Sequence, residues 1–169
     1  MYSTANVDDC RTILVSSPGP GEGKTTSVMN LAITYANLGK RTLLIDSDMR
    51  KPVIHSIFGL EKNKGLTTYL SGITDQYSNI IQDTEIENLK AVTSGILPPN
   101  PSELLLLSRM DRLMTELRSQ FDVILFDAPP LLAVTDAYIL TKYIEQFILV
   151  VRSGVTEADG MNRCLTQMK

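Results

Sequence analysis

The chain has 169 residues, of which 43% are hydrophobic and 21% are charged, and its formal net charge is -3. This length suits one domain with a sizeable core, and the acidic balance argues against a dedicated nucleic-acid binder, which usually carries a basic excess. Cys10 and Cys164 form no C-x-x-C pair, and no apolar run or leader resembles a membrane span or a secretory signal, so we expect a protein of the reducing cytoplasm.

The first third of the chain predicts a strand, a loop, a helix and a second strand. Residues 11–16 are mostly β-branched and apolar, and a loop of glycine and proline follows them. Residues 24–38 have apolar side chains at helical spacing and are followed by Gly39, a residue type that often comes just after a helix. Residues 41–46 predict the second strand, parallel to the first. The buried face of the helix is expected to contain Val28, Leu31, Ala32, Tyr35 and Leu38.

The middle of the chain is less periodic. It predicts a short helix at 65–70 and a third strand at 89–93. A Pro-Pro-Asn-Pro turn then predicts a helix that runs to about residue 118, with Asn100 as its cap and Glu103 reaching back. The buried face of this helix is expected to contain Leu106, Met110, Leu113, Met114 and Leu117.

The last third predicts two more strands and two more helices. Residues 122–127 and 146–152 are continuous apolar runs, as in strands covered on both faces. Residues 136–143 and 156–168 predict helices. Together these elements predict a doubly wound α/β fold, a mainly parallel sheet with helices on both faces, in a single domain over residues 1–169.

Residues 18–25 read Pro-Gly-Pro-Gly-Glu-Gly-Lys-Thr and match the phosphate-binding loop of P-loop NTPases, with proline at the first position. Glycines let backbone N–H groups turn toward phosphate oxygens, the lysine pairs with the phosphates, and the threonine hydroxyl binds Mg²⁺. The non-functional alternative is a surface turn. The segment follows a predicted strand and opens a predicted helix, which is the context of a phosphate-binding loop. The residues expected to bind the nucleotide are Gly19, Pro20, Gly21, Glu22, Gly23, Lys24, Thr25 and Thr26, with Arg152 placed near the base.

Three aspartates follow predicted strands, namely Asp46, Asp48 and Asp127. The carboxyl ends of parallel strands share one edge with the phosphate loop, so these side chains are expected to converge there. Asp127, after an apolar run, fits the Walker B position that holds Mg²⁺. The alternative is that strand-end aspartates cap turns.

The roles of four further polar residues are weighed against structural alternatives. Arg50 fits either a contact with phosphate or a partner chain, or a solvated surface position. Asp136 suits a helix cap better than a switch. Thr156 accompanies Arg152 after the last strand, and His55, the only histidine, is expected to be structural.

Four segments together resemble the bacterial tyrosine kinases of exopolysaccharide and capsule biosynthesis, a P-loop family related to the MinD and ParA ATPases. They are residues 17–25, 44–52, 97–105 and 121–130. The third of them, Leu-Pro-Pro-Asn-Pro-Ser-Glu-Leu-Leu, sets the chain apart from MinD-like and ParA-like proteins, which share the loop and both aspartate strands. The likeness covers nearly the whole chain.

The resemblance implies an ATP- and Mg²⁺-dependent tyrosine kinase that autophosphorylates in trans and regulates exopolysaccharide or capsule synthesis and export. It implies that Lys24 binds phosphate, that Asp46 and Asp48 form a second Walker A-like motif, and that one of those two activates the tyrosine hydroxyl. Thr25, Asp46 and Asp127 are the implied metal ligands. The catalytic set is therefore Lys24, Asp46 and Asp48.

The resemblance also implies partners. They are a transmembrane activator domain, on the same or a separate chain, and the tyrosine-rich C-terminal tails of sister subunits in a homo-oligomer. The protein would then lie in the cytoplasm at the inner face of the plasma membrane. This chain shows neither the family's upstream oligomerisation helix nor its final strands and tyrosine-rich tail, so we expect a fragment of a longer protein.

Rival functions are an ATPase switch like MinD or ParA, and a non-catalytic module that controls polysaccharide chain length by nucleotide-dependent assembly. MinD-like relatives carry a second lysine where this chain has Gly19. The intact loop and aspartates argue against a dead site. An ATP-dependent ligase lacks a substrate signature here, and GTP is disfavoured because no Asn-Lys-x-Asp segment is present.

Overall fold

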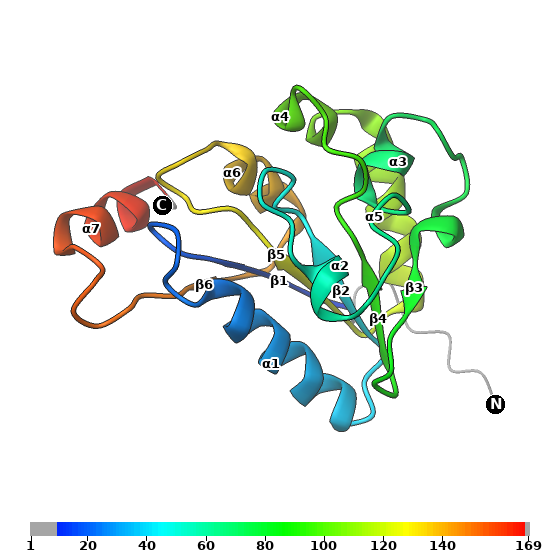
Figure 1. Cartoon of the computed structure of the whole chain (residues 1–169), viewed down its shortest axis with the longest axis horizontal. Helices are drawn as coiled ribbons and strands as arrows, with labels where there is room; N and C mark the ends of the chain where they lie inside the picture. Colours follow the sequence, from blue (N-terminus) through cyan, green and yellow to red (C-terminus); the bar gives the residue numbers. More distant parts are fainter. Residues whose placement is uncertain (1–9, 168–169) are drawn as a thin grey trace.

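The computed structural model describes residues 10–167, which form a six-stranded sheet between helices (Figure 1). The strand order is β3-β4-β2-β5-β1-β6, and every neighbouring pair is parallel except β3 and β4. This confirms the predicted doubly wound α/β fold. The strands are β1 (Arg11–Ser16), β2 (Thr42–Asp46), β3 (Gln82–Asp83), β4 (Leu89–Val92), β5 (Val123–Asp127) and β6 (Gln146–Leu149).

Helices cover both faces of the sheet, as Figure 1 shows for α1 on one side and for α3, α5 and α6 on the other. The α-helices are α1 (Lys24–Asn37), α2 (Ile54–Ile57), α3 (Leu66–Leu70), α4 (Pro101–Leu105), α5 (Ser108–Gln120), α6 (Asp136–Leu140) and α7 (Ala158–Gln167). Two short 3-10 helices are η2 (Tyr77–Ile80) and η3 (Thr141–Tyr143). No helix within residues 10–167 has the length and apolar character needed to cross a membrane.

Alternate side chains of each central strand enter different cores. On β5, Leu125 packs in the core beneath α1, whereas Ile124 and Phe126 pack in the core beneath α5. Because both faces are covered, all five residues of β5 are buried, as their apolar sequence predicted. Both cysteines are free and buried.

The opening strand–helix–strand unit is confirmed, and Gly39 follows α1 with the positive φ of 77° that favours glycine. The predicted buried face was wrong at Leu38, which is 70% exposed. Residues Val28, Ala32 and Ala36 form the fully buried stripe of α1 instead. The short elements α2, η2 and β3 have no counterpart in the sequence prediction.

The helix predicted to run unbroken to about residue 118 is two helices, α4 and α5. Leu107 has an extended backbone with ψ of 146°, which ends the first helix, and Leu106 is 69% exposed rather than buried. Leu105 takes the place in the core. Asn100 is the N-cap residue of α4 and Pro101 lies in its first turn, as predicted, but Asn100 makes no side-chain capping bond. Its amide instead donates to Glu103 Oε2 at 3.4 Å.

Two predictions near the end of the chain also need correction. The strand predicted over 146–152 is shorter, ending at Leu149, and β6 lies at the edge of the sheet with alternating exposed and half-buried residues. The helix predicted over 136–143 becomes α6 followed by η3. The last helix starts at Ala158, and its predicted end at Met168 lies outside the described residues.

Candidate active site at the strand ends

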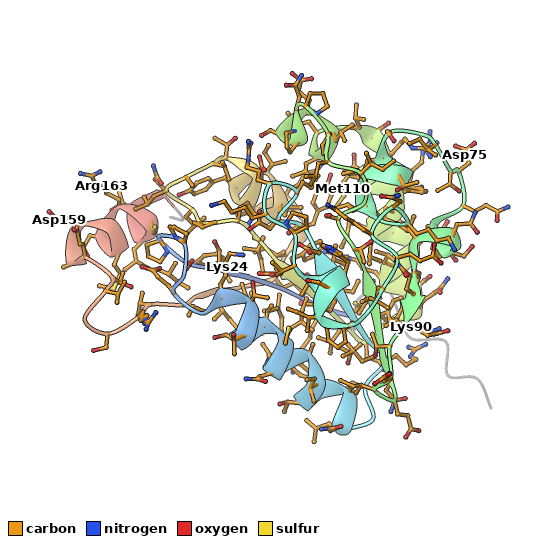
Figure 2. The ribbon with its side chains drawn as sticks, in the orientation of Figure 1. Lys24, Asp75, Lys90, Met110, Asp159 and Arg163 are labelled. Carbon is orange, nitrogen blue, oxygen red and sulfur yellow. The ribbon has the colours of Figure 1, made fainter. Side chains whose placement is uncertain are left out.

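The candidate site lies where β1, β2 and β5 end and α1 begins. In the sheet register Asp127 is the partner of Val15 on β1 and of Asp46 on β2. The loop of residues 17–23 leaves β1 at this edge and leads into α1 at Lys24. Figure 2 shows Lys24 at the start of α1, beside the ends of these strands. The expected convergence of the loop and the strand-end aspartates is therefore confirmed.

The backbone of the loop offers N–H groups to an anion. Gly21 and Gly23 have positive φ values of 74° and 95°, and no atom lies within 4 Å of the position that a Cβ would take on either residue. Within the described chain no side chain caps the first turn of α1. Those free N–H groups and the helix dipole together favour a bound phosphate.

Lys24 holds two carboxylates. Its Nζ lies 3.2 Å from Asp48 Oδ2 and 3.2 Å from Asp127 Oδ1. The hydroxyl of Thr25 donates to the other oxygen of Asp127 at 2.7 Å. Burial raises the pKa of Asp127, and the charge of Lys24 and the Thr25 bond oppose that rise only in part. The Asp127 side chain therefore joins the end of β5 to the first turn of α1.

Asp46 is fully buried, and its contacts are with backbone N–H groups. Its Oδ2 accepts from Val53 and Ile54 at 3.0 Å each, and its Oδ1 accepts from Asp48 at 3.2 Å. Burial is the main reason that the pKa of Asp46 rises to about 7. Asp46 thus fixes the segment after β2, and Asp48 is the residue of the two that contacts Lys24.

The oxygen atoms around Lys24 fit Mg²⁺ bound together with phosphate. Mg²⁺ usually takes one or two carboxylates and completes its octahedron with phosphate oxygens and water. The Thr25 hydroxyl and the Asp127 carboxylate supply such oxygens. Within residues 10–167 no group of three or more His, Cys, Asp or Glu side chains is arranged to hold a metal by itself. The donor set therefore fits a metal that arrives with a nucleotide.

A cleft of about 470 Å³ opens over the loop. Its lining includes the polar side chains of Lys24, Thr25 and Asp48. It also includes apolar residues and two cationic residues that the sequence did not group with the site. These are Arg50, Lys51, Val53, Pro129, Pro130, Ala133 and Val134.

Glu22 braces the phosphate loop, a role that no local pattern indicated. Its carboxylate accepts the N–H of Gly19 at 3.1 Å and the hydroxyl of Thr156 at 2.8 Å. Thr156 in turn accepts the N–H of Arg152 at 2.8 Å, and Arg152 Nη1 donates to the carbonyl of Gly21 at 3.3 Å. Arg152, expected beside a base, thus contacts the loop backbone through its guanidinium.

Arg50 and Asp136 contact each other, although they lie 86 residues apart. Arg50 Nε lies 3.4 Å from Asp136 Oδ2, and the Ser102 hydroxyl donates to Asp136 Oδ1. The cap expected from Asp136 is not formed. The carboxylate instead joins the segment after β2 to the start of α4.

Comparison with known proteins adds a family to this geometry. A family model described as an AAA domain matches residues 10–169. The tyrosine-protein kinase YwqD of Bacillus subtilis (strain 168) is 42% identical over 156 residues, which are 92% of this chain and 65% of that protein. The putative tyrosine-protein kinase CapB of Staphylococcus aureus is 38% identical over 167 residues, 95% of this chain and 72% of that protein.

A solved structure gives the same result. The crystal structure of the chimerical protein CapA2B2 superposes with a TM-score of 0.89 at 38% sequence identity, and covers 94% of this chain and 70% of the other. The chain thus spans between 65% and 72% of the length of these relatives.

Proposed function

The chain belongs to the family of bacterial tyrosine-protein kinases, and from this membership we propose that it transfers the γ-phosphoryl group of ATP to tyrosine hydroxyls in the presence of Mg²⁺. The observation that carries the proposal is the junction at Lys24, where a phosphate loop meets Asp48 and Asp127. Phosphoryl transfer depends mainly on positioning and on neutralising phosphate charge, and these groups are suited to both.

The loop N–H groups and Lys24 would hold the phosphates, and Thr25 with Asp127 would hold Mg²⁺. The metal supplies charge neutralisation on the phosphate oxygens. When Lys24 turns to the phosphates, its 3.2 Å contact with Asp48 Oδ2 is released. That oxygen is then free to accept the proton of the tyrosine hydroxyl. Asp46 would keep Asp48 in place through the Asp48 N–H.

We further propose that the physiological acceptors are tyrosine-rich C-terminal tails of sister copies, reached in trans within a homo-oligomer. A membrane-spanning activator would bring the domain to the inner face of the plasma membrane, where it regulates exopolysaccharide or capsule synthesis. Residues 1–169 would form one P-loop domain of a longer protein. The family membership supports these proposals, and they are separable from the chemistry.

A transfer assay with radiolabelled ATP and Mg²⁺ tests the chemistry. A tyrosine-rich peptide is the acceptor, and several protein concentrations are used because transfer between copies depends on concentration. We expect phosphotyrosine that disappears in Lys24→Met and persists in the control Lys40→Met, whose lysine is exposed at the far end of α1. Phosphate release without labelled peptide or protein would contradict the kinase proposal and favour an ATPase switch.

A further inference from the structure

Asp136 is a fully buried carboxylate that the proposed phosphate chemistry does not use. The Ser102 hydroxyl and Arg50 Nη2, which lies at 3.5 Å, both donate to its Oδ1. Among residues 10–167 its Oδ2 is buried without a hydrogen bond, and its neighbour is Arg50 Nε at 3.4 Å. Burying a carboxylate costs free energy unless a cation and hydrogen bonds compensate, and in the described part of the chain its one cationic partner is Arg50.

Arg50 is held along one edge and is open on the other. Its Nε and Nη2 face Asp136, and its side chain remains 43% exposed. Within residues 10–167 its guanidinium donates to no other group, and Arg50 lines the cleft that also contains Lys24 and Asp48. A guanidinium fixed in this way keeps free donors in a planar fork, the geometry that recognises carboxylates and phosphates.

The surroundings of Arg50 fit an aromatic residue with an acidic neighbour. Val53, Pro129, Pro130 and Val134 form an apolar wall of the cleft, against which an aromatic ring packs well. Lys51 follows Arg50 in the sequence, lines the same cleft and adds positive charge there. Asp48, whose Oδ2 lies 3.2 Å from Lys24 Nζ, lines the same cleft, where a tyrosine hydroxyl group would meet it.

We propose that Arg50 is a specificity-determining residue on the acceptor side of the cleft, where it binds an anionic group next to the acceptor tyrosine. Asp136 and Ser102 are its positioning residues. The anion is a carboxylate or, in a tail already labelled, the phosphate of a neighbouring phosphotyrosine. This inference rests on the proposed kinase function, and it adds the class of acceptor sequence that the site prefers.

Acceptor peptides that differ only beside the tyrosine test the inference. One peptide has glutamate at the flanking positions, one has glutamine, and one has phosphotyrosine. For the unaltered chain we expect kcat/KM for the glutamate peptide to exceed that for the glutamine peptide by about tenfold, mainly through KM. In Arg50→Gln this ratio falls toward one. Arg112→Gln, which removes a cation on α5 outside this cleft, keeps the ratio. Preference for the phosphotyrosine peptide over the glutamate peptide assigns the anion to phosphate.

Variants of Ser102 test the positioning role of Ser102 and Asp136 through the same ratio of kcat/KM values. Ser102→Ala keeps the charge of Arg50 but frees Asp136 to turn, so the ratio falls part of the way. Ser102→Thr restores the hydroxyl and is expected to restore the ratio. This pair tests the positioning of Arg50 without changing the buried Asp136 itself. If the ratio is the same in Ser102→Ala and Ser102→Thr, Ser102 and Asp136 do not position Arg50.

Three results would overturn the inference. The first is equal use of the glutamate, glutamine and phosphotyrosine peptides by the unaltered chain, and the second is an unchanged preference for the anionic peptides in Arg50→Gln. The third is a tenfold loss of Mg²⁺–ADP affinity in Arg50→Gln without peptide, which assigns the guanidinium to the nucleotide. If the unaltered chain labels no tyrosine, the kinase function itself fails, and this inference fails with it. Labelling without charge preference overturns only the role of Arg50.

Discussion

Asp46 and Asp127 are register partners at the ends of β2 and β5, and both side chains are buried. Asp127 has Lys24 and Thr25 as partners, whereas the partners of Asp46 within the described structure are backbone N–H groups alone. Burial raises the pKa of Asp46, and the negative charges of Asp127 and Asp48 raise it further. The edge of the sheet that would receive phosphate therefore has one carboxyl group that titrates near neutral pH.

The first prediction is a fall in stability as the pH rises. The pKa of Asp46 is about 7 in the folded chain and 3.8 ordinarily, so the folded chain keeps a proton that the unfolded chain has lost. The free energy of unfolding should therefore fall as the pH rises from about 4 to 7, and should level off above that, by roughly 1–4 kcal/mol. Urea denaturation between pH 5 and pH 8, without nucleotide, measures it.

Asp46→Asn is the control for this slope. The amide cannot ionise, so its profile should be flatter, with a residual slope from Asp127, whose pKa is also raised. Its NH₂ group meets a backbone N–H donor that the carboxylate accepted, so it should be less stable at every pH. The slope is thus the quantity to compare. Equal slopes in the two proteins would assign the pH dependence to other groups.

The second prediction concerns the stability cost of Lys24→Met. Removing the ammonium leaves the buried Asp127 without a counter-ion and raises its pKa further, because Lys24 now opposes that rise. We expect a loss of about 2–4 kcal/mol at pH 8 and a smaller loss at pH 5, because lower pH favours the neutral form of a carboxyl group whose pKa is raised. Denaturation of both proteins at the two pH values tests this. A loss independent of pH would mean that the methylenes of Lys24, not its charge, support the fold.

The convergence of the site residues could be predicted from the sequence because it follows from local rules. A strand, a glycine-rich loop and a helix place Lys24 at the sheet edge, and parallel strands bring Asp46 and Asp127 to the same edge. These features depend on short segments and on one topological rule. The burial of every residue of β5 could also be predicted from its own segment, because a strand buried on both faces is apolar throughout.

The features that could not be predicted depend on contacts between distant segments. Helical periodicity continues through Leu106, but the extended backbone of Leu107 ends α4 and leaves Leu106 in solvent. Asp136 is an aspartate at the start of a predicted helix, where such residues often form caps. Its buried position beside Arg50 and Ser102 gives it a different role. The bond from Thr156 to Glu22 joins residues 134 positions apart, and neither residue type indicates it.

The third prediction separates a metal role for Asp127 from a structural one. Asp127→Asn keeps an oxygen for the Thr25 hydroxyl but removes the charge that Mg²⁺ would meet. We expect nucleotide affinity to fall by about tenfold with Mg²⁺. In EDTA it should stay the same or rise, because a negative charge near the phosphates is gone. Titration of a fluorescent ADP under both conditions tests it. An equal loss in both would show that Asp127 acts through the fold.

The fourth prediction is that Glu22 and Thr156 act as one brace on the phosphate loop. Thr156→Val keeps the shape but removes the hydroxyl that donates to Glu22 and accepts the Arg152 N–H. We expect nucleotide affinity to fall by about threefold to tenfold, and amide exchange in residues 19–25 to become faster. Thr166→Val, which removes an exposed hydroxyl on α7, is the matched control.

A double-mutant cycle tests whether Glu22 and Thr156 act together on the phosphate loop. Glu22→Gln weakens the acceptor for Gly19 and Thr156, so the double variant should lose less than the sum of the two single losses. We expect a coupling of about 1 kcal/mol in nucleotide binding. Additive losses would mean that Thr156 supports only the turn after β6 and Glu22 only the loop. A coupled loss with faster exchange at residues 19–25 would mean that order in the loop depends on the turn at 152–156, so a ligand contact at that turn would change nucleotide affinity.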